Sequence, residues 1–188
     1  LRGFDDDVRS TLATEMRKRG VELRFGTTVE RLARTADGVA ATLSSGDTIG
    51  SDLVLWATGR APNTSGLGLE ELGVCLDARG AVIVDEHLES SVPGVYALGD
   101  VIDRITLTPV ALAEGTALAR SLFGGTPTTV DYSNVPTAVF SQPAVAAVGL
   151  SEAAARAAGH EVVVFRSTFR PLLHRLSGRD EQTMMKLV

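Results

Sequence analysis

A carboxylate follows an apolar segment near the middle of the chain, in residues 95–100, which read VYALGD. A continuous apolar run is typical of a buried strand, and an open α/β sheet binds its ligands at the carboxyl ends of its strands. Gly99 permits close approach of the backbone, and Asp100 offers two acceptor oxygens that suit the hydroxyls of a sugar or ribityl chain. The pattern indicates a nucleotide site, and an ordinary turn capped by Asp100 is the alternative.

The start of a helix follows this turn, at Thr108 and Pro109. Proline fits the first position of a helix, and residues 109–123 are rich in alanine. The free N–H groups and the positive dipole end of a helix start favour an electron-rich ligand edge. Thr108 could equally be only the N-cap of this helix, and the two roles are compatible.

Several short segments resemble, in their order and spacing, the flavoprotein disulfide reductases that bind two dinucleotides. These segments are residues 56–64 (WATGRAPNT), 84–86 (VDE), 99–100 (GD) and 107–111 (LTPVA). Three more segments narrow the resemblance to the glutathione reductases of plant and bacterial type, namely residues 1–5 (LRGFD), 169–172 (FRPL) and 176–179 (LSGR). The resemblance covers essentially the whole chain.

The resemblance implies an NADPH-dependent oxidoreductase that carries FAD and acts on glutathione disulfide as a homodimer. In such an enzyme, reducing equivalents pass from NADPH through the flavin and a redox disulfide to glutathione disulfide. This chain would supply cofactor contacts and no catalytic residue, because the redox cysteines and the catalytic histidine of the family have no counterpart in it. The alternatives are another class I reductase (lipoamide dehydrogenase, mercuric reductase or mycothiol disulfide reductase) and a non-catalytic remnant that only binds partners.

The implied fold class is α/β, with completing segments of two Rossmann-like nucleotide-binding domains and the start of an α+β dimerisation domain. Residues 1–58 would complete the NADP-binding domain, residues 59–131 would be the second segment of the FAD-binding domain, and residues 132–188 would begin the dimer interface. No G-x-G-x-x-G occurs in the chain. We therefore expect the pyrophosphate-binding first halves of both nucleotide sites to lie outside it.

Two residues are implied in FAD binding. By resemblance, the Asp100 carboxylate binds a ribityl hydroxyl, and the backbone N–H of Thr108 reaches the flavin pyrimidine oxygen. Thr116 departs from the family pattern, since some glutathione reductases carry arginine there to meet a substrate carboxylate. This departure puts that contact, and with it the exact disulfide substrate, in doubt.

Five residues are implied in NADP binding. Arg2 matches an arginine that contacts the adenosine 2′-phosphate, for which the paired donors of a guanidinium are well suited. An exposed arginine at a helix start is the alternative. Gly59 and Arg60 would lie near NADP, although this Pro- and Gly-containing turn could need such residues for its shape alone. Thr106 and Ala138 match positions on the nicotinamide side.

The remaining chemically reactive side chains do not form a site. Cys75 stands alone, and we predict a buried bystander thiol. His87, His160 and His174 have no metal-ligand spacing, and we predict surface or packing roles for them. We therefore expect no metal and no internal disulfide.

The elements that must position these residues follow from periodicity and turn signals. A surface helix is predicted for residues 5–19, which begin acidic and end basic, and a second helix is capped by Ser151. Strands are predicted for residues 21–25, 29–34, 39–43, 48–50, 137–140, 144–148, 162–165 and 184–188. Residues 52–57 predict a buried strand and residues 95–100 another.

Composition excludes several classes of partner. The 188 residues carry a net charge of −5 without a basic stripe, so nucleic acid is not expected. The apolar stretches are shorter than a membrane span, and the first residues do not form a signal sequence. We expect a soluble, cytoplasmic protein with no membrane partner.

Overall fold

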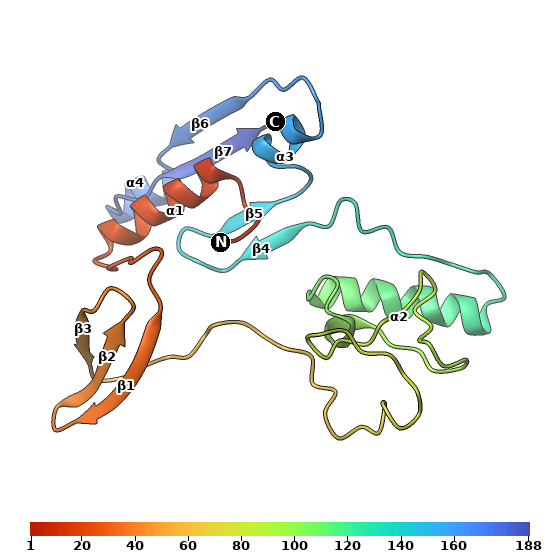
Figure 1. Ribbon diagram of the computed structural model, residues 1–188. Coiled ribbons are helices and arrows are strands. Elements are labelled where there is room, and N and C mark those ends of the chain that lie inside the picture. The colour runs from red at the N-terminus through yellow and green to blue at the C-terminus, as the bar shows by residue number, and fades with distance from the viewer. The chain divides into compact units, whose positions relative to one another are not determined.

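The computed structural model describes residues 1–188, and Figure 1 shows them as a ribbon. The chain folds as two units: the first comprises Leu1–Trp56 and Asn134–Val188, and the second comprises Ala57–Ser133. Together they hold four α-helices and seven short strands, which agrees with the expected α/β class. None of the helices has both the length and the apolar composition that crossing a membrane requires. The three-domain division stays a prediction.

The first unit begins with helix α1 (Asp6–Lys18), which confirms the predicted helix. The Asp5 side chain caps it by accepting the backbone N–H of Asp7 at 2.9 Å. Acidic residues in the first turn and basic residues in the last turn complement the helix dipole. Leu12 and Ala13 are buried, so one face of this helix contributes to the core.

A three-stranded antiparallel sheet follows, in the order β1 (Val29–Thr35), β2 (Gly38–Leu43) and β3 (Thr48–Ser51). These bounds confirm the strands predicted for this stretch. The first hairpin requires Gly38, whose φ is +135°, because a side chain there would collide with the Ser51 carbonyl. The sheet is thus fixed by local turn chemistry.

The remainder of the first unit consists of two antiparallel strand pairs and two short helices. Strand β4 (Thr137–Val139) pairs with β5 (Val145–Ala147), and β6 (Phe165–Phe169) pairs with β7 (Thr183–Leu187). The helices are α3 (Glu152–Ala157) and α4 (Leu172–Ser177). The Ser151 hydroxyl accepts the N–H of Ala154 at 3.2 Å, which confirms the predicted cap of α3. Figure 1 shows α1 beside β7, and the backbone N–H of Gln182 donates to Glu15 of α1.

The second unit is built on helix α2 (Thr108–Phe123) and the single 3₁₀ turn η1 (Gly99–Ile102). A small core of buried residues holds its loops together: Val74, Val82, Leu88 and Ile102. Isolated antiparallel bridges take the place of strands there, such as that between Leu76 and Val82. The helix and η1 are the elements that position the site described below.

Two segments that were predicted as buried strands are not strands. Residues 52–57 are extended and exposed, with Leu53 83% and Trp56, the only tryptophan, 71% exposed. Residues 95–98 form only one bridge, between Glu89 and Tyr96. A strand needs a neighbour for its N–H and C=O groups, and all strand pairs in this chain are antiparallel pairs of other segments.

Two further strand predictions fail for the same reason. Residues 21–25 pair with no segment and form no strand, and only Phe165 of residues 162–165 joins β6. An apolar composition favours a strand only when a partner lies within reach.

Candidate functional site

The Gly99–Asp100 turn packs against helix α2 in the second unit. Gly99 is buried and has a φ of +73°, which favours glycine. A Cβ built there would lie 3.2 Å from the Cβ of Ala111 on α2. A side chain at this position would therefore push the turn away from the helix, so glycine is needed both for the conformation and for the close approach.

The Asp100 side chain is 52% exposed. Its one charged neighbour is Arg60, whose Nε lies 3.6 Å from Oδ2. The structure thus brings two predicted site residues together. The alternative, in which the Asp100 side chain caps its own turn, is not supported, because only the backbone carbonyl of Asp100 accepts a bond there, from Asp103. The carboxylate oxygens are free to accept hydroxyl donors.

Helix α2 begins without a side-chain cap. Its N-cap is Leu107, an extended residue whose side chain cannot accept a hydrogen bond, and Pro109 follows in the first turn. The prediction of Thr108 as a possible N-cap is therefore wrong by one position, because Thr108 is already helical. Thr106 and Thr108 are both exposed. Pro109 has no N–H, and the Val110 N–H donates to the Leu107 carbonyl, so the N–H of Thr108 is the first-turn group left to a ligand edge of acceptor character, such as the flavin predicted there.

A network of buried hydrogen bonds holds the Gly99–Asp100 turn in place. Glu114 on α2 is 1% exposed. The backbone N–H of Gly99 donates to Glu114 Oε2 at 2.6 Å, and the Tyr132 hydroxyl donates to Oε1 at 2.8 Å. Arg104 donates to the Tyr132 oxygen at 3.1 Å and stacks over its ring at 4.9 Å. Burial, and next the bond to Glu114, raise the pKa of the Tyr132 hydroxyl, which stays a donor.

Sequence reasoning missed Glu114, although a signal was present. Val110, Glu114 and Ala117 are spaced at i, i+4 and i+7 and form the buried stripe of α2. An acidic residue within such a stripe is costly unless it is hydrogen-bonded. The signal was therefore a charge on the apolar face of a helix next to the candidate turn.

Gly59 and Arg60 lie in the loop that begins the second unit. Gly59 has a φ of +125°, which favours glycine, and no atom lies within 4 Å of a Cβ built there. This conformation is one reason for glycine here, and the role of Gly59 toward NADP stays a prediction. The 83% exposed side chain of Arg60 is available to a ligand phosphate as well as to Asp100.

The other two predicted site residues belong to the first unit. Arg2 precedes α1, is exposed and pairs with no carboxylate. Ala138 is exposed on β4 and lines a cavity of about 950 Å³, together with Gly3, the neighbour of Arg2. The roles of these two residues toward NADP stay predictions.

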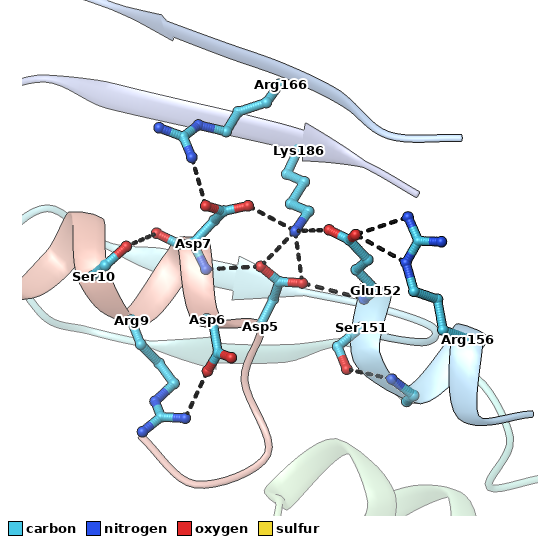
Figure 2. Close-up of polar contacts among 11 residues, drawn as sticks. Asp5, Asp6, Asp7, Arg9, Ser10, Ser151, Glu152, Arg156, Arg166 and Lys186 are labelled. Atoms are coloured by element: carbon cyan, nitrogen blue, oxygen red, sulfur yellow. Dashed lines mark hydrogen bonds and ion pairs between the residues drawn. The ribbon is translucent and has the colours of Figure 1, made fainter. Parts of the chain in front are cut away.

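Figure 2 shows an ion-pair cluster in the first unit, centred on the amine of Lys186. Its Nζ lies 2.9 Å from Asp5, 2.7 Å from Asp7 and 2.8 Å from Glu152. The Lys186 side chain is only 6% exposed. Two arginines pair with the outer sides of the carboxylates, Arg156 and Arg166. The cluster joins the start of α1, the start of α3 and strand β7.

The charges of this cluster stabilise one another. Burial alone would lower the pKa of the Lys186 amine, but its hydrogen bonds to the three carboxylates raise that pKa overall. Burial would raise the pKa of Asp5, but the bonds from Lys186 and from backbone N–H groups lower it overall. The bond from Lys186 is the main cause that lowers the pKa of Asp7 and of Glu152. The cluster contains no predicted cofactor contact and serves the architecture.

The remaining candidates are resolved individually. Cys75 is exposed, so its predicted burial is wrong: its loop is tied down by its backbone N–H, which donates to Ser91, and not by packing of the thiol. His174 is buried against Glu181, in keeping with a packing role. Thr116 donates to the Leu112 carbonyl and lines a shallow cavity of about 650 Å³ along α2. No group of His, Cys, Asp or Glu side chains is arranged to hold a metal ion.

Comparison with known proteins agrees with this picture. Residues 1–115 match the family described as pyridine nucleotide-disulphide oxidoreductase, and residues 135–188 match the dimerisation domain of that family. The chain is 50% identical to the glutathione reductase of Burkholderia cepacia over 188 residues, which are 100% of this chain and 42% of that protein. It is 42% identical to the chloroplastic/mitochondrial glutathione reductase of Pisum sativum, over 100% of this chain and 34% of that protein.

The fold is similar to a solved structure as well. The HOCl-induced flavoprotein disulfide reductase RclA from Escherichia coli matches with a TM-score of 0.86 and 27% identity, over 99% of this chain and 43% of that chain. The chain thus spans less than half the length of the proteins that it resembles.

Proposed function

Because the chain belongs to the pyridine nucleotide-disulphide oxidoreductase family, we propose that it is part of an NADPH-dependent, FAD-containing glutathione-disulfide reductase. The observation that carries the proposal is the Gly99–Asp100 turn, which packs against α2 and leaves the Asp100 carboxylate half-exposed, with only the exposed Arg60 beside it. The 50% identity to a glutathione reductase along the whole chain supports glutathione disulfide as the substrate. The match to a dimerisation domain supports a homodimer.

The residues present fit FAD. A hydroxyl-bearing ribityl chain suits the half-exposed Asp100 carboxylate, and an acceptor oxygen of an isoalloxazine ring suits the backbone N–H of Thr108. When bound, FAD and NADPH supply the electron-transfer chemistry. Asp100 would bind and orient the ribityl chain, and the positive end of the α2 dipole would stabilise negative charge at the edge of the isoalloxazine ring.

For NADPH, Arg2 provides a guanidinium without an internal partner, matched to the 2′-phosphate that distinguishes NADPH from NADH. Gly59, Arg60, Thr106 and Ala138 are the remaining proposed contacts. We place the enzyme in the cytoplasm. Thr116 in the shallow cavity along α2 leaves the family's arginine contact with the disulfide substrate unfilled.

Substrate selection by the full-length protein tests the proposal. The protein is purified and assayed for NADPH oxidation with glutathione disulfide, lipoamide, mercuric ion and mycothiol disulfide. We expect a yellow protein whose turnover is fastest with glutathione disulfide. Preference for another acceptor would assign it to one of the other class I reductases, and a colourless, inactive full-length protein would make it a binding remnant.

A further inference from the structure

We propose that Glu114 is a positioning residue of the flavin site, which holds the Gly99–Asp100 turn so that Asp100 presents its carboxylate to the ribityl chain. The inference rests on the proposed function, because it gives Glu114 its role through FAD binding. Its basis is a carboxylate that is 1% exposed and has both oxygens engaged inside the second unit.

Packing alone does not account for a glutamate at this position. A helix face that only needed to pack would carry an apolar side chain at this position, as it does at Val110 and Ala117. Burying a carboxylate is costly unless hydrogen bonds compensate the lost hydration. Glu114 has two such bonds, and one of its donors is the backbone of the site itself.

The bond from the Gly99 N–H fixes the turn. Gly99 is buried, so without Glu114 its N–H would be left unpaired away from water. Holding this N–H fixes the peptide that precedes Gly99, and Asp100 is the next residue in the chain. Glu114 does not touch the Asp100 carboxylate, whose neighbour is Arg60. It therefore acts on the ligand only through the position of Asp100.

Tyr132 and Arg104 fix the direction of the second bond. Arg104 has only donors and gives one to the Tyr132 oxygen, so the hydroxyl hydrogen is directed to Glu114. A glutamine at position 114 has one acceptor oxygen in place of two, so the Gly99 N–H and the Tyr132 hydroxyl would compete for it. One of the two donors would lose its acceptor, and the turn would be held less firmly.

The test is a double-mutant cycle on the full-length holoenzyme. FAD dissociation constants are measured for the unsubstituted protein, Glu114→Gln, Asp100→Asn and the double variant, with Glu71→Gln as an exposed control in the same unit. We expect the dissociation constant to rise about tenfold for Glu114→Gln. The double variant should bind FAD as Asp100→Asn does, within about twofold, because Glu114 has no effect once the Asp100 carboxylate is gone.

Other outcomes overturn the inference. If Glu114→Gln binds FAD as well as Glu71→Gln does, or if the two losses multiply in the double variant, Glu114 is structural only. Should Glu114→Gln fail to fold, Tyr132→Phe replaces it in the cycle with the same expectation, and multiplying losses there overturn the inference equally. An unsubstituted protein that binds no FAD would be a failure of the proposed function, which this control reveals separately.

Discussion

At the scale of single residues, two nearby carboxylates of the second unit differ in exposure and in ion pairing. Asp103 is 17% exposed and pairs with Arg79 at 2.5 Å, whereas Asp100 is 52% exposed and has only Arg60 at 3.6 Å. Exposed pairs at such a distance contribute little to stability. Asp100 is thus the carboxylate that the fold leaves available, and Asp103 is a structural residue.

Asp100→Ala in the full-length protein should therefore release FAD. Losing a hydrogen bond to a charged acceptor costs about 1.5–3 kcal/mol, or roughly ten- to a hundredfold in affinity. Dialysis followed by flavin absorbance measures the loss. Glu86→Ala is the control, since Glu86 is exposed in the same unit, whereas removing Asp103 would break its pair with Arg79. Equal flavin retention in both variants would remove Asp100 from the site.

Arg2→Ala should weaken NADPH far more than NADH, because only NADPH carries the 2′-phosphate. The lost charge-assisted bond should cost roughly 1.5–3 kcal/mol, again about ten- to a hundredfold. KM values for both nucleotides, with the exposed Arg34→Ala as control, measure the difference. An equal effect on NADPH and NADH would show that Arg2 supports α1 and that other residues select the nucleotide.

The two carboxylates of the candidate site differ in how far sequence could predict them. Asp100 could be predicted because its signal is local: a glycine and an acid after an apolar run. Glu114 shows in the sequence only as an acid on the apolar face of a helix, and its role could not be predicted because it depends on Gly99, 15 positions earlier, and on Tyr132, 18 positions later. Long-range partners of this kind emerge only from the packing of helix and turn.

At the scale of elements, the ion-pair cluster joins α1, α3 and β7, which are far apart in the sequence. Lys186 is its only cation shared by three carboxylates. Removing one partner of a buried set leaves the others uncompensated, which is more damaging than replacing the whole set. The Lys186 amine is therefore the one group that links all three elements directly.

Lys186→Met should lower the free energy of unfolding by about 3 kcal/mol at neutral pH. Arg9→Met, which removes only the exposed pair with Asp6, should cost less than about 1 kcal/mol. Urea unfolding of the full-length protein measures both. Equal effects would mean that the cluster is no stronger than a surface pair.

The same comparison has a pH dependence. The folded-state pKa values of Asp5, Asp7 and Glu152 are lowered, so their contribution to stability is present above the ordinary values of 3.8 for Asp and 4.5 for Glu. It is lost as the pH falls through the lowered values. As the pH falls from about 5 to 2, the free energy of unfolding should therefore decrease less for Lys186→Met than for the unsubstituted protein. Parallel curves would contradict this assignment.

Elements with local signals were predictable and those that need partners were not. The acidic cap of α1, Ser151 before α3 and the turns of the first sheet are all encoded within a few residues. The apolar residues 52–57 contain no such signal, and their exposure reflects the lack of a pairing strand in this chain. Periodicity reports a potential face of an element, but only a neighbour can bury it.

At the scale of the whole molecule, several large apolar side chains are exposed. Leu55 is 85%, Phe123 87% and Phe140 96% exposed. Large apolar side chains left this exposed are available for contact with other segments or chains. This exposure agrees with a chain that spans less than half of its relatives' length and matches a dimerisation domain.

Purified by itself, the 188-residue chain should be colourless and should not oxidise NADPH. It contains no G-x-G-x-x-G segment to bind a pyrophosphate and only one cysteine, so it cannot form a redox disulfide within itself. An absorbance spectrum after dialysis and a glutathione disulfide assay give the answer. A stable flavin band from residues 1–188 alone would contradict the expectation that both pyrophosphate sites need segments outside them.

The exposed Trp56 gives the protein a built-in optical reporter. It is the only tryptophan and the last residue before the chain passes into the second unit. All indole fluorescence therefore comes from this one crossing, without an attached dye. Its emission should be red-shifted, as for a hydrated indole, in residues 1–188 alone. A blue shift of this emission when a partner is added to residues 1–188 would register the covering of residues 52–57.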